Sequence, residues 1–419
     1  MTVKRIAALL ALTLATGAAG AAEIAVACGS MGFDVEICRT LAKDWSAKTG
    51  HKVRIFVTPK SSTDQLELYR RQFAIKSGEL DILVVDVIWP AIMREHLIDL
   101  TPYAKGTQKE HFPALVANNT VQGKLLAMPW FTEAGLLYYR KDLLAKYKEK
   151  VPTTWEEMTA TARRIQDAER KAGNARMSGF VFEGRAYEGL TCNALEWIAS
   201  YGGGTVIDGR GKITINNPRA AAAFDLVAGW KGSISPNDVT NYAEEDARMA
   251  FQSGNAVFMR NWMYAWHMAQ KDDSPVKGKI GLAALPHGPG GASAATLGGW
   301  HLAVSKYSAH PDLAADLVMF LSSKAMQKKR ALIVGSLPTH PSLYRDPDVL
   351  KAVPYAASLG EAFRTAVVRP STVTEDKYDA VSEAIWSISS AVMNRKLKGA
   401  EAVLQLDRDL VKVRRGPQW

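Results

Sequence analysis

In the N-terminal part of the chain, segments with the hydrophobic pattern of a β-strand alternate with segments that have the pattern of an α-helix. Short apolar runs at 23–27, 51–57 and 81–85 have the length of β-strands, and apolar residues recur at helical spacing over 35–48 and 64–76. This strand–helix order predicts a parallel sheet with helices on both faces.

Two loops follow the carboxyl ends of these predicted strands. Residues 29–34 follow the first strand, and residues 86–90 follow the third. Ligands of open α/β sheets bind at that edge, where the loops converge. Both loops are therefore candidates for a binding site.

The middle of the chain has a helix-rich pattern. Thr154 and Glu157 have capping-box spacing at the head of a helix that extends to about residue 171, and Asn217 precedes Pro218 at the start of another. After a Gly- and Pro-rich stretch the strand and helix pattern of the first part returns. The remaining predicted elements are strands at 256–259 and 301–304 and helices at 245–251, 311–323, 377–394 and 400–413.

The order of these patterns predicts a two-lobed α/β fold with a ligand cleft at a multi-strand hinge. A chain of 419 residues exceeds one ordinary core. We expect an N-terminal α/β lobe of 23–133 and 297–331 and a helix-rich C-terminal lobe of 134–296 and 332–419. The expected crossings lie near Phe131–Glu133, Thr296–Gly299 and Leu332–Ser336.

The first 22 residues have the features of a secretory signal peptide. Lys4 and Arg5 precede an apolar run at 6–14, and small residues ending in Ala21 and Ala22 form a cleavage site. The apolar run is too short to span a bilayer. These features predict a periplasmic protein.

The charge pattern gives no sign of nucleic-acid binding. The net charge is +10, of which Lys4 and Arg5 contribute two, so about +8 is left for the mature chain. Basic residues are scattered without a long run, which favours a soluble basic surface over a nucleic-acid partner.

Three cysteines are consistent with an oxidising compartment. Cys28 and Cys38 are close enough in the sequence to bridge a short loop, and the spacing leaves open whether they do. Cys192 is then expected to be a buried thiol.

The sequence has no motif of the common enzyme classes. It lacks a Gly-x-Ser-x-Gly elbow, a phosphate loop, His-Glu-x-x-His and Cys-x-x-Cys, and its eight histidines show no metal-ligand spacing. A glycosidase using carboxylates such as Asp34, Asp86 or Glu133 is the alternative that these absences leave open. We expect no enzyme activity, no cofactor and no metal site.

The aromatic composition suits sugar binding. The chain has 11 Trp and 13 Tyr, and several of them lie in Pro- and Gly-rich loops, whereas Trp197, Trp230 and Trp386 are expected in the core. Sugars present hydroxyls to carboxylates, arginines and amides, and apolar ring faces to aromatic side chains.

Several long motifs carry a family resemblance over nearly the whole mature chain. The segment 128–144 resembles the first interlobe crossing of family 1 solute-binding proteins of ABC importers. Segments 260–266 and 273–279 are similar to the trehalose/maltose-binding branch, and 294–301 and 367–370 agree with it. The resemblance implies the two-lobed fold of a type II-like periplasmic binding protein.

The resemblance also implies a set of ligand-binding residues. An Arg near the second helix that contacts one glucose in thermophilic relatives has no counterpart here, and Ser62 and Gln65 stand near its position as neutral donors. The candidate site consists of Asp34, Ser62, Gln65, Asp86, Phe131, Glu133, Trp262, Tyr264, Gly298, Gly299, Trp300 and Arg369.

The function implied by the resemblance is capture of an α-glucoside disaccharide, of the trehalose, maltose or sucrose type, by hinge closure. The expected partners are this ligand and an inner-membrane ABC permease with its cytoplasmic ATPase, and the protein is expected to be a monomer. Alternatives are a different ligand for the same fold (an oligosaccharide, a polyol or a phosphosugar) and a secreted glycosidase.

Overall fold

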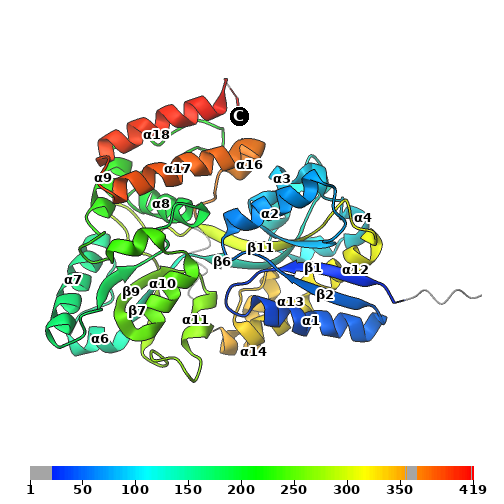
Figure 1. Ribbon diagram of the computed structural model, residues 1–419, viewed down its shortest axis with the longest axis horizontal. Helices are drawn as coiled ribbons and strands as arrows, with labels where there is room; N and C mark the ends of the chain where they lie inside the picture. Colours follow the sequence, from blue (N-terminus) through cyan, green and yellow to red (C-terminus); the bar gives the residue numbers. More distant parts are fainter. Residues whose placement is uncertain (1–20, 354, 356–365, 417) are drawn as a thin grey trace, which may run out of the picture.

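The computed structural model describes residues 21–353, 355, 366–416, 418 and 419. The predicted signal peptide lies outside the described residues except for Ala21 and Ala22. Within this described part of the chain, no helix has the length and apolar character needed to cross a membrane. Two lobes lie side by side in Figure 1, with β6 and β11 running between them.

The first lobe is built on a five-stranded sheet in the order β2-β1-β3-β11-β6. β1 is parallel to β2 and β3, as predicted, whereas β11 is antiparallel to both β3 and β6. The sheet is therefore mixed, because β6 leaves this lobe and β11 returns to it beside β6. Its strands are β1 (Glu23–Cys28), β2 (Lys52–Val57), β3 (Ile82–Asp86), β6 (Met128–Ala134) and β11 (Leu297–Val304), and β4 (Thr120–Val121) and β5 (Lys124–Leu125) form a small hairpin.

Helices cover both faces of this sheet. Val26 of β1 packs in a cluster with Leu41 of α1, and the next residue, Ala27, packs on the other face with Leu66 of α2. This alternation is the period-2 pattern of a strand buried on both sides. The main helices are α1 (Asp34–Thr49), α2 (Ser62–Ala74), α3 (Trp89–Ile92), α4 (Thr101–Ala104), α5 (Pro113–Asn119), α12 (Pro311–Ser322) and α13 (Lys324–Val334).

The second lobe has a four-stranded sheet in the order β10-β7-β9-β8 under a larger set of helices. Its strands are β7 (Leu136–Arg140), β8 (Ser178–Val181), β9 (Ala256–Asn261) and β10 (Ile280–Ala283). Its helices are α6 (Lys141–Lys146), α7 (Trp155–Lys171), α8 (Glu188–Ser200), α9 (Pro218–Ala228), α10 (Glu244–Ala250), α11 (Tyr264–Ala269), α14 (Pro347–Ala352), α16 (Ser371–Thr374), α17 (Tyr378–Met393) and α18 (Gly399–Arg414).

Capping residues define the start of α7 in this lobe, and packed aromatic side chains form the core beneath its helices. The predicted capping box of α7 is formed, with Thr154 Oγ1 accepting from the Glu157 N–H at 3.2 Å and the Glu157 carboxylate accepting from the Thr154 N–H at 3.2 Å. Trp197 and Trp230 are buried together at 5.8 Å between ring centroids, as expected for core residues. Trp386 is half-buried against the same core, so the expectation of a core position is met only in part.

Three segments lie side by side where the two sheets meet. Thr132 of β6 pairs with Gly299 of β11 on one side, and on the other side its N–H donates to the Leu337 carbonyl at 3.1 Å. β6 continues through Gly135 into β7 of the second lobe, and a side chain at Gly135 would collide with Glu196 and Arg260. We propose this three-segment contact as the hinge of the two lobes.

A disulfide bond joins Cys28 at the end of β1 to Cys38 in α1. The sequence spacing did not decide whether this bond forms. In the structure the bond is present and closes the loop that contains Asp34. Cys192 is a free, buried thiol, as expected.

Candidate ligand-binding site

Two adjoining compartments lie between the lobes. Met31, Glu133 and Trp300 line both of them and therefore form their shared wall. The first compartment is also lined by Ser62, Asp86, Glu188, Gly189, Cys192, Glu244, Trp262, Gly298, Gly299 and Arg369. The second is also lined by Phe33, Asp34, Phe131, Tyr264, Arg330, Val334 and Ser336.

Strands of the first sheet position Trp300 and Glu133 of the shared wall. Trp300 of β11 is paired in register with Asp86 at the end of β3 and with Phe131 of β6, and Gly298 is paired with Glu133. Asp86, Trp300 and Phe131 therefore form one row across the sheet, and Gly298 and Glu133 form a second row two residues further along. Gly299 has φ +135°, and a β-carbon there would lie 2.6 Å from the Phe131 carbonyl oxygen, so this close approach requires glycine.

A buried ion triad joins the lobes in the first compartment. Arg369 donates to the Asp86 carboxylate from Nη2 at 2.6 Å and from Nη1 at 3.2 Å, and its Nη1 also donates to Glu188 at 2.9 Å. Asp86 belongs to the first lobe and Glu188 to α8 of the second. Glu188 also accepts hydrogen bonds from Tyr378 at 2.6 Å and Ser382 at 2.5 Å. Burial raises the pKa of Glu188, and the charge of Arg369 opposes that rise.

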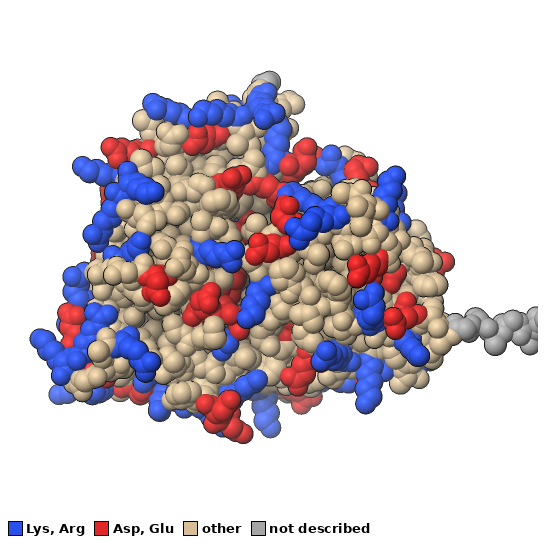
Figure 2. Space-filling view, in the orientation of Figure 1, with Lys and Arg blue, Asp and Glu red and all other residues tan. Residues whose placement is uncertain are grey.

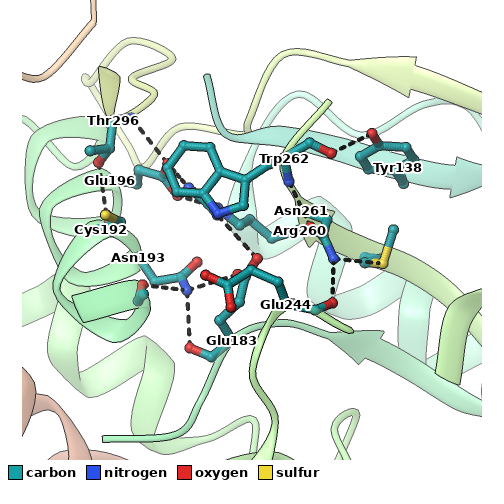
Figure 3. A network of polar contacts seen from close by, with 12 residues as sticks. Tyr138, Glu183, Cys192, Asn193, Glu196, Glu244, Arg260, Asn261, Trp262 and Thr296 are labelled. Atoms are coloured by element: carbon teal, nitrogen blue, oxygen red, sulfur yellow. Dashed lines mark hydrogen bonds and ion pairs between the residues drawn. The ribbon is translucent and has the colours of Figure 1, made fainter. Parts of the chain in front are cut away.

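A second buried network lies behind Trp262 (Figure 3). Arg260 forms a bidentate pair with Glu196, at 2.9 Å and 2.5 Å, and a third bond to Glu183 at 3.2 Å. Its guanidinium carbon lies 4.0 Å from the centroid of the Trp262 ring. Glu196 also accepts the Thr296 N–H at 3.0 Å, which ties the start of β11 to α8. This network holds both the Trp262 ring and the hinge strand in place.

Acidic and aromatic side chains line the second compartment. Tyr264 donates its hydroxyl hydrogen to Glu245 at 2.8 Å. Asp34 accepts one long hydrogen bond, 3.4 Å, from Arg330. Burial, with a smaller contribution from the charge of Asp34, raises the pKa of Glu133 to about 8. Burial also raises the pKa of Glu244, in the first compartment, to about 7.

Eleven of the twelve candidate residues line these compartments, and Gln65 does not. The Gln65 amide nitrogen donates to Tyr69 at 2.8 Å and to the Val84 carbonyl at 2.9 Å, and its oxygen accepts from Thr58 at 3.2 Å. Gln65 therefore bonds within the first lobe and lies outside both compartments, and its predicted ligand contact stays a prediction. Its i,i+4 position relative to the buried Tyr69 places it on the inner face of α2.

Sequence reasoning missed three charged residues of the compartments, Glu188, Glu244 and Arg330. Each lies within or at the start of a helix, outside any motif singled out in the sequence. A charged residue among apolar residues of a predicted helix could have identified them. A charged side chain is seldom fully buried unless it is paired with another group, so its presence there points to such a partner. Among the described residues, no cluster of three or more His, Cys, Asp or Glu side chains could hold a metal ion.

We expect Glu133→Gln to change how stability depends on pH. Folded Glu133 keeps its proton until about pH 8, whereas the unfolded chain releases it near 4.5. A raised folded pKa gives stability that is lost as pH rises through this window. The free energy of unfolding of the parent should therefore fall, relative to Glu133→Gln, by on the order of 2–4 kcal/mol between about pH 5 and about pH 8.

Urea unfolding of both proteins at several pH values within that range measures this difference. Comparing the two proteins cancels the histidines and the other titrating groups they share. A difference that stays constant with pH would mean that Glu133 ionises normally in the folded protein.

Comparisons with known proteins agree on one family. Residues 38–328 match the family described as bacterial extracellular solute-binding protein. A protein of Deinococcus radiodurans named "Probable ABC transporter-binding protein" is 48% identical over 99% of this chain and 100% of its own length. The solved structure of maltose-bound T. maritima MalE3 has a TM-score of 0.88 and 39% identity, and the match covers 94% of this chain and 100% of that one.

A more distant solved structure supports the fold alone. It is an Agrobacterium radiobacter solute-binding protein in complex with ribitol, with a TM-score of 0.81 at 21% identity, covering 94% of this chain and 98% of that one. The two-lobed architecture is thus shared among relatives whose ligands differ.

Proposed function

The chain belongs to the family of bacterial extracellular solute-binding proteins, and we propose that within it the protein captures a neutral α-glucoside disaccharide of the trehalose, maltose or sucrose type. The observation that carries the proposal is the pair of adjoining compartments with a shared wall that includes Trp300. We assign one pyranose ring to each compartment, so the proposed ligand has two linked rings.

The chemistry of the lining supports a carbohydrate. Trp262 and Trp300 provide aromatic faces for the apolar side of a sugar ring. Asp86 and Glu133 provide acceptors for hydroxyl groups, and Arg369 provides a donor. Aromatic faces beside a few convergent polar groups are the usual composition of a selective small-molecule site.

The balance of charge supports a neutral ligand over a phosphosugar. Four carboxyl groups line the first compartment beside the single guanidinium of Arg369, and two line the second beside Arg330. Glu133 keeps its proton to about pH 8, so the charges that would repel a phosphate in the first compartment are those of Asp86 and Glu188, which already pair with Arg369 there.

The similarity to a maltose-bound protein supports the α-glucoside class. That relative shares 39% identity with this chain over nearly its whole length. Relatives below 25% identity include a protein in complex with ribitol, so the fold alone does not choose the ligand.

Closure of the lobes around the sugar provides the signal for transport. Ligand contacts from both lobes stabilise the closed form only when the sugar is present, which is population shift by differential affinity. As in other ABC solute-binding proteins, a membrane permease with its ATPase then receives the sugar. We propose that the protein acts in the periplasm, as a monomer, and releases its ligand chemically unchanged.

The distribution of charge on the surface is consistent with the proposed sugar-binding function. Figure 2 shows Lys and Arg side chains interspersed with Asp and Glu over the face in view. A nucleic-acid partner would call for a concentrated basic patch, and this face offers none.

A thermal-shift panel tests the proposed function. The ligands are trehalose, maltose, sucrose, glucose, mannitol, ribitol and glucose 1-phosphate, each at the same concentration. We expect one or more of the disaccharides to raise the unfolding midpoint most, because a ligand bound only to the folded state stabilises it by mass action. A largest shift with a polyol or with the phosphosugar would overturn the ligand class, and cleavage of the sugar during incubation would overturn the binding-protein assignment.

A further inference from the structure

Three buried arginines can be compared around the two compartments. The exposed fractions of the Arg260, Arg369 and Arg330 side chains are 1%, 2% and 4%. Arg260 uses Nε, Nη1 and Nη2 in hydrogen bonds to two carboxylates. Arg369 uses both terminal nitrogens on Asp86 and Glu188. These two arginines are held by the protein itself.

Arg330 is different, because most of its donors have no partner. Among the described residues, Nε and Nη1 are buried without a hydrogen-bond acceptor, and Nη2 makes only the 3.4 Å contact to Asp34. The guanidinium carbon lies 4.2 Å from the Trp130 ring centroid and 4.0 Å from that of Phe131. Two aromatic faces thus fix the guanidinium while leaving its N–H groups unused.

Burying a guanidinium without hydrogen-bond acceptors costs folding free energy, because the charged group loses its hydration and gains no partner in return. Arg330 also lines the second compartment, so its free donors are beside the space that a ligand would fill. Within the proposed function, on which this inference rests, we propose that Arg330 is a ligand-binding and specificity-determining residue. It donates hydrogen bonds to neighbouring oxygen atoms of the sugar ring held in the second compartment.

The surroundings of Arg330 select a neutral polyhydroxyl ligand. An isolated buried arginine would attract a phosphate or a carboxylate, but Asp34 and Glu133 line the same compartment. A pair of ring hydroxyls can accept from the guanidinium and donate to these carboxyl groups at once, because a hydroxyl is both donor and acceptor. An anion would accept from Arg330 and face Asp34 without a proton to donate.

The test compares Arg330→Met with Arg260→Met. Methionine keeps the side chain long and apolar between Trp130 and Phe131, where its sulfur packs well against aromatic rings. We expect Arg330→Met to weaken binding of the preferred disaccharide by about a hundredfold or more, as for two lost charge-assisted hydrogen bonds. Its unfolding midpoint without ligand should stay unchanged or rise. Arg260→Met should lower that midpoint, because it leaves Glu183 and Glu196 buried without their partner.

Arg330→Lys separates charge from geometry. Lysine keeps the positive charge but lacks the planar fork, so we expect it to recover only part of the affinity lost in Arg330→Met. Binding is measured by calorimetric titration with maltose, trehalose and sucrose, and the midpoint by thermal unfolding.

Each outcome bears on one of the two proposals. Affinity of Arg330→Met within about threefold of the parent would show that Arg330 does not contact the ligand, and a midpoint lowered as far as in Arg260→Met would assign it a structural role. Binding of inorganic phosphate or glucose 1-phosphate in preference to the neutral disaccharides would overturn the neutral-ligand inference. If the parent binds none of the three disaccharides, the proposed function fails, and the unfolding midpoints of the two variants still decide whether the Arg330 donors are unpaired.

Discussion

Replacing Trp300 with alanine is expected to weaken disaccharide binding by about a hundredfold or more while the protein remains folded. Trp300 lines both compartments, so its indole ring lies where the two sugar rings would meet. The ring is only half-buried, and it packs edge-on to Trp89 at 5.5 Å between centroids. Removing it therefore takes away a large contact surface for the ligand while most of the apolar core is kept.

Calorimetric titration of the parent and of Trp300→Ala measures this effect, and circular dichroism verifies the fold. Trp386→Ala is the matched control, because Trp386 is also a half-buried tryptophan but lines neither compartment. We expect the control to bind as the parent does. Normal binding by Trp300→Ala, or equal losses in both variants, would move the ligand away from the shared wall.

Replacing Arg260 with methionine is expected to lower the free energy of unfolding by about 3–5 kcal/mol. Glu183 and Glu196 are fully buried, and Arg260 is the guanidinium that pairs with both. Loss of Arg260 leaves two carboxyl groups in a low-dielectric interior, each of which must then take up a proton or remain an unpaired charge.

Urea unfolding of Arg260→Met gives this difference, with Arg164→Met as the control. Arg164 pairs with Glu149 at 2.7 Å, but its side chain is 57% exposed, and exposed pairs contribute about 1 kcal/mol or less. A loss in Arg260→Met no greater than in Arg164→Met would mean that the buried network adds little to stability.

The strands and helices that could be predicted are those whose own sequence contains the signal. The helices of the first lobe have apolar residues at helical spacing, and α7 has its capping box in four consecutive residues. β3 is a continuous apolar run, as expected of a strand buried on both faces. In each case the pattern that fixes the element is local.

The hinge strands were harder to predict because distant partners define them. β6 and β7 form a mostly apolar stretch, interrupted by Thr132, Glu133 and Gly135, that has neither a clean alternation nor a helical period. β6 pairs with β11, more than a hundred and fifty residues later in the chain, and this pairing makes the first sheet mixed. The direction of β11 depends on the route of the chain through the other lobe, which no local pattern contains.

The site residues divide in the same way, into those that belong to a local motif and those whose roles depend on distant partners. Asp86, Trp300 and Arg369 were predicted through the family resemblance of motifs at strand ends or loops, and all three line the first compartment. Arg330 and Glu188 were missed because their roles depend on neighbours that are distant in the sequence, 296 residues away for Asp34 and 181 for Arg369. Gln65 was predicted because the family resemblance places it near a missing Arg, whereas its helical phase turns it toward the buried Tyr69.

The central claim is that a disaccharide binds between the lobes with one ring in each compartment. Calorimetric titration of the mature protein, freed of any sugar carried through purification, with trehalose, maltose, sucrose and glucose tests it most directly. We expect one site per chain and an affinity for one disaccharide about a hundredfold or more above that for glucose, because glucose can fill only one compartment. Equal affinity for glucose and the disaccharides, or no heat with any of the four, would contradict it.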